Sequence, residues 1–470
     1  MRSLILLPLG ALLLLAQVSE AGAQAAPNSS LESRFQAAVA QYDAGHFGEA
    51  ARQLEALQRE APESFEVQEL LGLVYSAQSQ DVQANEHLAE AVRLQPDSAA
   101  ARSNLAANLM RLRKPERAQE QFRKAVELEP GNGDANHNLG EAYIRAGNVA
   151  KAVPFLERAQ KIDGSSYDNG YDLSLAYLLT GRLGDARQLV QELISRKNAA
   201  ELHNLLGQIE EKDGKFVTAE NEFELAARAE PSESNLFDWG SELLLHRTLE
   251  PAIAEFQQAT SRYPDSPRLA IGLGMALYGL GKYDDAVKSL LRGADLSPSD
   301  PTCYLFLARA YDSSPSQADD VIQRFQRYAQ LQPGNANAQY YYAMSLWKGK
   351  RAQDPSLDLH RIELLLKTSI ALNPTFAEAH LQLGNLYSDQ NHFATAIPEY
   401  QRAGELNPDL SDVYYRLGQA YVRTGDKDRA QEQFETYQRL RAQHLADLDK
   451  QKAEIRQFVY SAKDAPNARP

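Results

Sequence analysis

The nine histidines and the single cysteine are the residues of this chain that could support metal or nucleophilic chemistry, and their spacing favours neither. A zinc-binding helix needs two histidines four residues apart, as in His-Glu-x-x-His, and no such pair occurs. The chain also lacks a phosphate-cradling glycine-rich loop followed by lysine, and a Gly-x-Ser-x-Gly elbow. Cys303 stands beside Tyr304 and Leu305, where a buried structural thiol is expected. The sequence therefore predicts a protein that is not an enzyme, with no catalytic residue, no metal site and no cofactor, although missing motifs do not refute catalysis.

The charge of the chain limits its partners. The formal net charge is −14 over 470 residues, whereas nucleic-acid binding needs a basic surface. No cluster of lysines and arginines is present that would hold an anionic membrane. We expect no nucleic-acid partner, and the acidic residues are expected to lie on solvated helix faces.

The N-terminus has the pattern of an export signal. A positively charged start precedes an apolar run over residues 4–16 and small residues at 21–23. We predict a signal peptide at residues 1–23, a polar linker at 24–30, and a periplasmic or secreted protein with no membrane span after cleavage. The alternative is that the segment is kept as an anchor, but its apolar run is short for a membrane span and is interrupted by proline and glycine.

The elements that would position any functional residue form a repeat, best seen at residues 377–410. Its first half places Leu383 and Gly384 on one helical face, and its second half does the same with Ala396 and Tyr400. Small residues let helix axes approach closely, and large rings fill the space between them. This stretch predicts two short amphipathic helices joined by a turn.

The same pattern returns along the chain. Nine of the 21 prolines recur at a spacing of about 34 residues and mark the turns between units: Pro62, Pro96, Pro130, Pro231, Pro264, Pro298, Pro333, Pro374 and Pro408. The small residue of the second helix recurs with them: Ala50, Ala84, Ala118, Ala152, Ala186, Ala219, Ala252, Ala286, Ala396 and Ala430. We therefore expect about twelve units, which begin near residues 31, 65, 99, 133, 167, 200, 233, 267, 301, 336, 377 and 411.

Two units depart from the common length. One carries an extra residue within 312–315, and the other carries about seven extra residues within 349–358. Such insertions map to loops at one edge of a repeat array. They are either tolerated loop extensions or functional segments.

The pattern resembles the tetratricopeptide repeat, a helix–turn–helix unit of about 34 residues. The resemblance implies an all-α, right-handed superhelical solenoid of about twelve repeats over residues 31–440. Apolar residues at helical spacing after 440 predict a capping helix at 441–461, since an uncapped array exposes apolar surface. Residues 462–470 are expected to be disordered.

The resemblance also implies a concave groove lined by the first helix of each unit. Two asparagines one repeat apart would begin a ladder of the kind that grips peptide backbones, and aromatic side chains would follow it. These predicted groove residues are Asn104, Asn138, Tyr171, Phe237, Tyr278, Tyr340 and Tyr415. The rings would either contact a peptide or fill gaps between first helices.

These observations predict a non-catalytic scaffold or assembly factor that acts outside the cytoplasm and binds a protein or peptide ligand in the groove. No small-molecule substrate is evident. The alternative is a regulatory or substrate-presenting module for a separately encoded envelope enzyme that modifies glycans or peptides.

Overall fold

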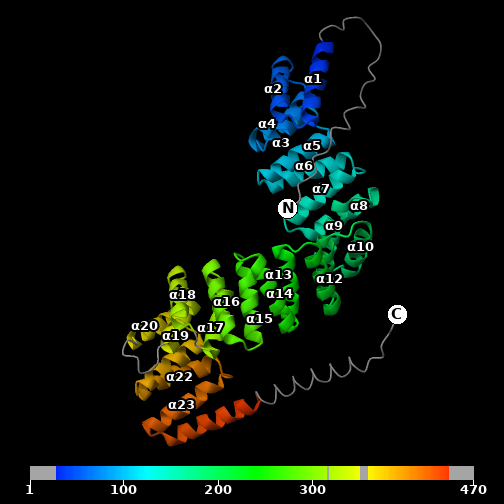
Figure 1. Ribbon diagram of the computed structural model, residues 1–470. Coiled ribbons are helices and arrows are strands. Elements are labelled where there is room, and N and C mark those ends of the chain that lie inside the picture. The colour runs from blue at the N-terminus through cyan, green and yellow to red at the C-terminus, as the bar shows by residue number, and fades with distance from the viewer. Residues whose placement is uncertain (1–27, 315–316, 350–357, 444–470) are drawn as a thin grey trace, which may run out of the picture. The chain divides into compact units, whose positions relative to one another are not determined.

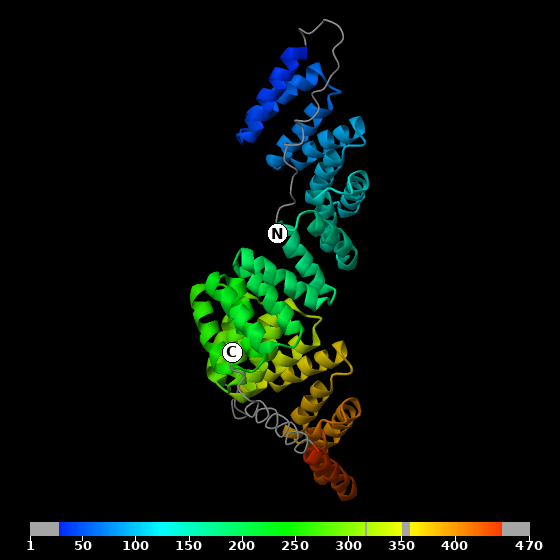
Figure 2. The same ribbon diagram turned by 90° about the vertical axis from the view of Figure 1, so that its right-hand side faces the viewer.

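The computed structural model describes residues 28–314, 317–349 and 358–443, and within these residues the regular elements are all helices (Figure 1). The chain divides into two compact units, residues 1–231 and residues 232–470. We call them the N-terminal unit and the C-terminal unit. Each consists of antiparallel helical pairs, which we describe as a first and a second helix (Figure 2).

Among its described residues, the N-terminal unit contains six pairs. Its first helices are α1 (Asn28–Asp43), α3 (Phe65–Ala77), α5 (Ala99–Arg111), α7 (Gly133–Arg145), α9 (Tyr167–Leu179) and α11 (Ala200–Lys212). Its second helices are α2 (Phe47–Glu60), α4 (Asp81–Leu94), α6 (Pro115–Leu128), α8 (Val149–Ile162), α10 (Leu183–Arg196) and α12 (Phe216–Ala229).

The C-terminal unit continues the pattern. Its first helices are α13 (Glu233–Leu245), α15 (Pro267–Gly279), α17 (Pro301–Ser313), α19 (Ala336–Gly349), α21 (Ala377–Asp389) and α23 (Ser411–Thr424). Its second helices are α14 (Leu249–Arg262), α16 (Tyr283–Leu296), α18 (Ala318–Leu331), α20 (Leu359–Leu372), α22 (Phe393–Leu406) and a last helix at residues 427–443.

The predicted repeat frame is confirmed at its helix starts. From α3 onward, each first helix begins at the residue number expected from the repeat. The exception is α1, which begins at Asn28, so the predicted linker at 24–30 is wrong for its last three residues. Pro27 directly precedes this helix, and proline is compatible with a helix start because the first turn needs no backbone donor from it.

Short polar side chains start many of the first helices. The hydroxyl oxygens of Ser64, Ser98 and Ser166 accept hydrogen bonds from backbone N–H groups in the first turns of α3, α5 and α9. Asn132 and Asp300 do the same for α7 and α17. These caps satisfy donors that a helix leaves free at its N-terminus.

Small residues of the first helix face large residues of the second helix within each pair. A Cβ atom added at Gly384 of α21 would lie 2.7 Å from the ring of Tyr400 in α22. Gly207 of α11 meets Phe223 of α12 in the same way, at 2.9 Å. The alanines predicted for the second helix are buried, with at most 2% exposure. The sizes of these residues therefore let the axes of the two helices in each pair approach each other closely.

The two repeats that carry insertions differ in how much of the insertion the structure describes. The connection between α17 and α18 spans 314–317, one residue longer than the corresponding connections, and Gln317 adopts a left-handed conformation at φ 55°. The extra residue there is confirmed. Residues 350–357 of the larger insertion lie outside the described residues, as do the predicted signal peptide and the part of the predicted cap from 444 onward.

The structure divides the expected single array over 31–440 after Pro231. The proline that marks this division occupies an ordinary turn position, and the repeat spacing runs through it unchanged. The spacing of the repeats along the sequence depends on contacts inside each helical pair. It therefore does not indicate a boundary between the two units.

Candidate functional site

Two of the predicted groove aromatics contact neighbouring first helices in the C-terminal unit. The guanidinium of Arg268 in α15 lies 4.6 Å from the centroid of the Phe237 ring in α13. The ring of Tyr278 in α15 meets Phe306 of α17 edge to face, with 6.0 Å between centroids. Both predicted rings are half-buried. They therefore bridge adjacent first helices and keep part of each ring accessible.

The other two predicted aromatics of this unit differ in exposure. Tyr340 is half-buried, packs 4.9 Å from the ring of Phe376, and has a phenol pKa raised by burial. Tyr415 is 40% exposed, although its ring lies 6.0 Å from Phe434 and 5.2 Å from Tyr437. Burial and ring contacts thus support a packing role for Tyr340, whereas Tyr415 presents a large open ring on α23.

The N-terminal unit places its predicted groove residues differently. Asn104 and Asn138 are 3% and 1% exposed, so the expectation that they present amides to an open groove is wrong for this structure. Each lies where adjacent first helices pack together, which encloses that side of the helix. The Asn104 amide nitrogen donates to the carboxylate of Glu69 at 3.2 Å, while the amide of Asn138 has no hydrogen-bond partner among the described protein groups. Tyr171 is half-buried.

Two buried polar groups of this unit were not among the predicted residues. Glu69 of α3 is 5% exposed, and burial raises the pKa of its carboxyl group to about 7, opposed by the hydrogen bond from Asn104. His137 of α7 lies 2.9 Å from the carboxylate of Asp172 in α9. Glu69 and His137 occupy the helix position that carries aromatic rings in later repeats. Alignment of the repeats with one another would have revealed that contrast.

Cys303 of α17 is fully buried, as the sequence predicted. Its thiol donates to the carbonyl oxygen of Leu290 at 3.2 Å, and burial raises the thiol pKa to about 12. Because the thiolate is the reactive form, this cysteine is held in its unreactive state at neutral pH.

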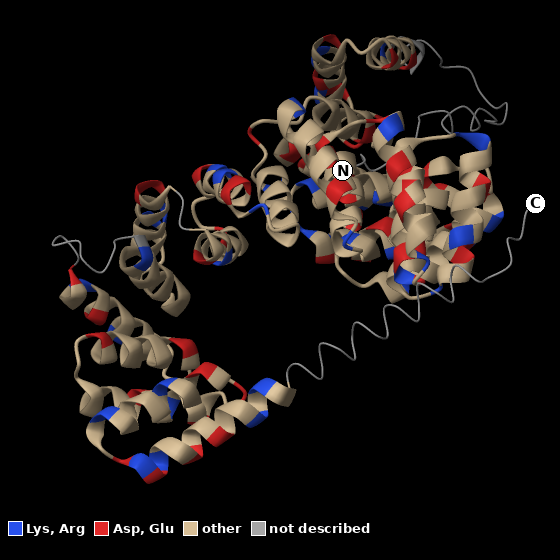
Figure 3. Ribbon diagram, turned by 60° about the horizontal axis from the view of Figure 1, so that its bottom comes forward, with Lys and Arg blue, Asp and Glu red and all other residues tan. Residues whose placement is uncertain are grey.

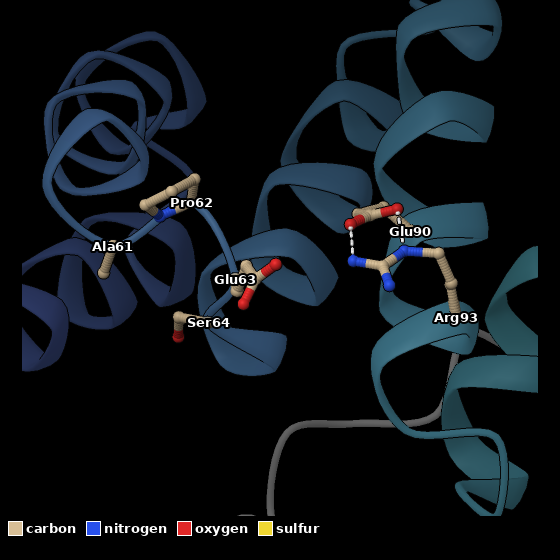
Figure 4. Close-up of a pocket in the computed structure, with 6 residues that line it drawn as sticks. All are labelled: Ala61, Pro62, Glu63, Ser64, Glu90 and Arg93. Atoms are coloured by element: carbon tan, nitrogen blue, oxygen red, sulfur yellow. Dashed lines mark hydrogen bonds and ion pairs between the residues drawn. The ribbon is translucent and has the colours of Figure 1, made fainter.

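The described residues offer little basis for a catalytic or metal centre. Among them, no group of three or more histidine, cysteine, aspartate or glutamate residues is arranged to hold a metal ion. A shallow depression follows α2, and Glu90 and Arg93 pair with each other at 2.6 Å across its wall (Figure 4). Ala61, Pro62, Glu63 and Ser64 complete it. Its one cation, Arg93, is already paired with Glu90, and Glu63 adds a second carboxylate, so the depression shows no free cation for an anionic ligand.

Acidic and basic residues are interspersed along the helices (Figure 3). Over the part of the chain that the structure describes, none of the helices combines the length and the apolar character that a membrane crossing requires. These features define a helical repeat protein whose distinctive side chains line the first helices.

Comparison with known families identifies the repeat. Tetratricopeptide repeat models match residues 35–99, 103–167, 237–301, 145–209, 365–397, 384–425 and 411–444. Together these matches cover more than half of the chain. The protein therefore belongs to the tetratricopeptide repeat family, whose members bind protein partners.

Individual relatives are distant. Over 199 residues, 40% of this chain, it is 22% identical to protein O-mannosyl-transferase TMTC3 from Mus musculus, and the match spans 20% of that protein. Over 190 residues, again 40% of this chain, it is 25% identical to TPR repeat-containing protein YpiA from Bacillus subtilis (strain 168), over 42% of that protein. The chain thus spans less than half the length of either relative.

A solved tetratricopeptide repeat protein from Parabacteroides merdae is 18% identical, with a TM-score of 0.41. That similarity covers 53% of this chain and 99% of the solved chain.

Proposed function

We propose that this protein is a non-catalytic scaffold or assembly factor that acts outside the cytoplasm and binds a protein or peptide partner along its first helices. The observation that carries the proposal is the set of half-exposed rings in the C-terminal unit, represented by Phe237 and Tyr278. Rigid aromatic side chains supply large contact area at a small cost in conformational entropy. Their placement on successive first helices suits an extended or helical ligand.

The proposed location rests on the N-terminal sequence pattern of residues 1–23. It is tested by fusing alkaline phosphatase, which is active only after export, to the full chain and to a chain that begins at residue 24. Activity of the first fusion alone supports export. Equal activity of the two fusions contradicts it.

The proposed binding face is tested by photo-crosslinking in the intact chain. A benzoyl-phenylalanine at Tyr278 should crosslink to a partner protein in an envelope extract. The matched control is the same substitution at Leu364, which is 59% exposed on the second helix α20. Crosslinks of equal yield and identity at both positions would contradict binding along the first helices.

A paired measurement separates binding from packing. The double variant Phe237→Ala and Tyr278→Ala should retain its helicity and lose partner affinity by several hundred-fold or more, if each ring is a contact residue worth about 2 kcal/mol. If the rings only pack, the same variant should lose stability at each ring, by less than the cost of about 3–5 kcal/mol for a fully buried ring, and the folded fraction should bind normally. Thermal melts and binding assays on the same samples distinguish the two results.

A second candidate is a regulatory or substrate-presenting module for a separate envelope enzyme. The match to a segment of protein O-mannosyl-transferase TMTC3 favours it, because that name describes an enzyme that transfers mannose to proteins. The crosslinked partner should then carry transferase or hydrolase activity, and that activity should change when this protein is added.

A further inference from the structure

Three neighbouring first helices of the C-terminal unit carry an unusual set of side chains at equivalent positions. Met275 of α15, Arg309 of α17 and Met344 of α19 each occupy the ninth position of their repeat. The two methionines are half-buried, and the arginine between them is exposed. Helix α17 contacts both α15 and α19, so the three side chains form one stripe. Methionine is flexible and polarisable, and therefore suits an adaptable apolar contact.

Aromatic rings lie beside the cation of this stripe. The Arg309 guanidinium lies 5.5 Å from the centroid of the Phe306 ring, which in turn meets Tyr278 edge to face. Arg309 is also close enough to Tyr341 for its positive charge to oppose the rise in phenol pKa that burial causes. A guanidinium is a planar group, and contact with an aromatic ring restricts its orientation.

Arg309 differs from nearby cations in having no acidic partner. Arg268 pairs with Glu233, Lys348 pairs with Asp312, and Arg324 lies 3.0 Å from a carboxylate oxygen of Asp295. Within the residues that the structure describes, the Arg309 guanidinium forms no ion pair and lies against the Phe306 ring. An exposed arginine that forms no ion pair and lies against an aromatic ring is complementary to a carboxylate.

We propose that the surface formed by Tyr278, Phe306, Arg309, Met275 and Met344 binds an extended segment of a partner protein that carries an acidic residue between apolar ones. The partner's carboxylate pairs with the Arg309 guanidinium. Its flanking apolar side chains pack against the rings and the methionines. This inference rests on the proposed function, and it names the chemistry of the ligand at one part of the binding face.

The probe is a terminally blocked, fluorescein-labelled peptide in which glutamate alternates with leucine and phenylalanine. Two matched peptides replace every glutamate by glutamine or by lysine. Fluorescence anisotropy with the full chain should show that the glutamate peptide binds about tenfold more tightly than the glutamine peptide, because a charge-assisted hydrogen bond is stronger than a neutral one. The preference should decrease with added salt.

Variants of the chain test the assignment to Arg309. Arg309→Gln should weaken binding of the glutamate peptide about tenfold and leave the glutamine peptide nearly unchanged. Arg309→Glu should reverse the preference towards the lysine peptide. The matched control is Arg262→Gln, because Arg262 is also exposed and lies 5.9 Å from a tyrosine ring, but at the end of the second helix α14. This control should bind all three peptides as the unmodified chain does.

Several outcomes would overturn the inference. They are no binding of the glutamate peptide up to about 1 mM, equal binding of the glutamate and glutamine peptides, equal effects of the two arginine variants, or an Arg309-dependent self-association of the chain in sedimentation.

If the peptides bind without regard to charge and the Phe237 and Tyr278 double variant abolishes that binding, the inference fails and the proposed function stands. If crosslinking also yields no partner at Tyr278, both fail.

Discussion

The N-terminal and C-terminal units share one helical frame and differ in what their first helices carry. In the N-terminal unit, buried polar groups occupy the contacts between first helices, as Glu69 and Asn104 illustrate with their hydrogen bond of 3.2 Å. In the C-terminal unit, rings and a cation occupy comparable places, as in the edge-to-face pair of Tyr278 and Phe306.

The difference teaches that the repeat constrains only some of its positions. The contact between the first and second helix needs a small residue opposite a large one in both units, as Gly140 with Leu156 and Gly384 with Tyr400 show. Side chains between successive first helices face fewer constraints, because successive first helices touch each other less extensively than the two helices of a pair do. Those positions are where the two units have acquired different chemistry.

The largest expected effect tests the shared frame. Phe122→Ala in α6 and Phe256→Ala in α14 should each lower the free energy of unfolding of their own unit by about 3–5 kcal/mol, because each ring is fully buried and its loss leaves a cavity. Hydrogen exchange measured separately for peptides of the two units reports the local loss. Phe216→Ala, at a residue 45% exposed, is the control for the same chemical change. Strongly unequal losses at Phe122 and Phe256 would contradict a common frame.

A smaller effect is specific to the N-terminal unit. The Glu69 pKa is raised to about 7 in the folded state, so that state binds a proton more tightly than the unfolded state does. The contribution of Glu69 to the free energy of unfolding is therefore largest below about pH 4.5. It decreases by up to about 3 kcal/mol as the pH rises through 7. Glu69→Gln should remove this part of the pH dependence in melts between pH 5 and 8. The exposed control Glu127→Gln should not, and identical profiles for all three proteins would show that Glu69 titrates normally.

A third prediction concerns the small residues of the second helices. Ala118→Leu in the N-terminal unit and Ala286→Leu in the C-terminal unit should each cost about 1–3 kcal/mol, since both alanines have 0% exposure and no space for a larger side chain. Ala442→Leu, on an exposed part of the helix at 427–443, should be nearly neutral in urea unfolding. If all three variants behave alike, the repeat register is not the one described.

The smallest expected effect has the opposite sign. Asn138→Leu should stabilise the N-terminal unit by about 1–2 kcal/mol, because the buried amide of Asn138 has no described protein partner and leucine is of similar size. Asn104→Leu, which breaks the hydrogen bond to buried Glu69, is the contrasting variant and should destabilise the unit. Denaturant midpoints measure both. A loss of stability at Asn138 equal to that at Asn104 would indicate that the two amides are equally well satisfied.

Much of the fold could be predicted from the amino-acid sequence, and much less of the candidate site. The helix starts from Phe65 to Ser411 and the buried alanines follow from turn prolines and residue size, which act within one pair. The aromatic set was predicted as groove residues or as packing residues, and the contacts of Phe237 and Tyr278 show that one ring can both bridge helices and stay partly exposed. Arg309 could not be predicted from the sequence, because what distinguishes it is the lack of an ion-pair partner among the described residues. That property depends on which side chains surround Arg309 in the folded chain.

The sequence by itself determined the helical pair, its repetition and its boundaries, because the small, large and turn-forming residues that specify them lie within about one repeat of each other. Only the tertiary structure decided which first-helix side chains remain open and where the array divides into two units. Asn138 and Arg309 both belong to first helices, yet one is 1% exposed and the other is exposed. That outcome depends on which side chains the neighbouring helices place around each residue, and only the folded chain brings those side chains together.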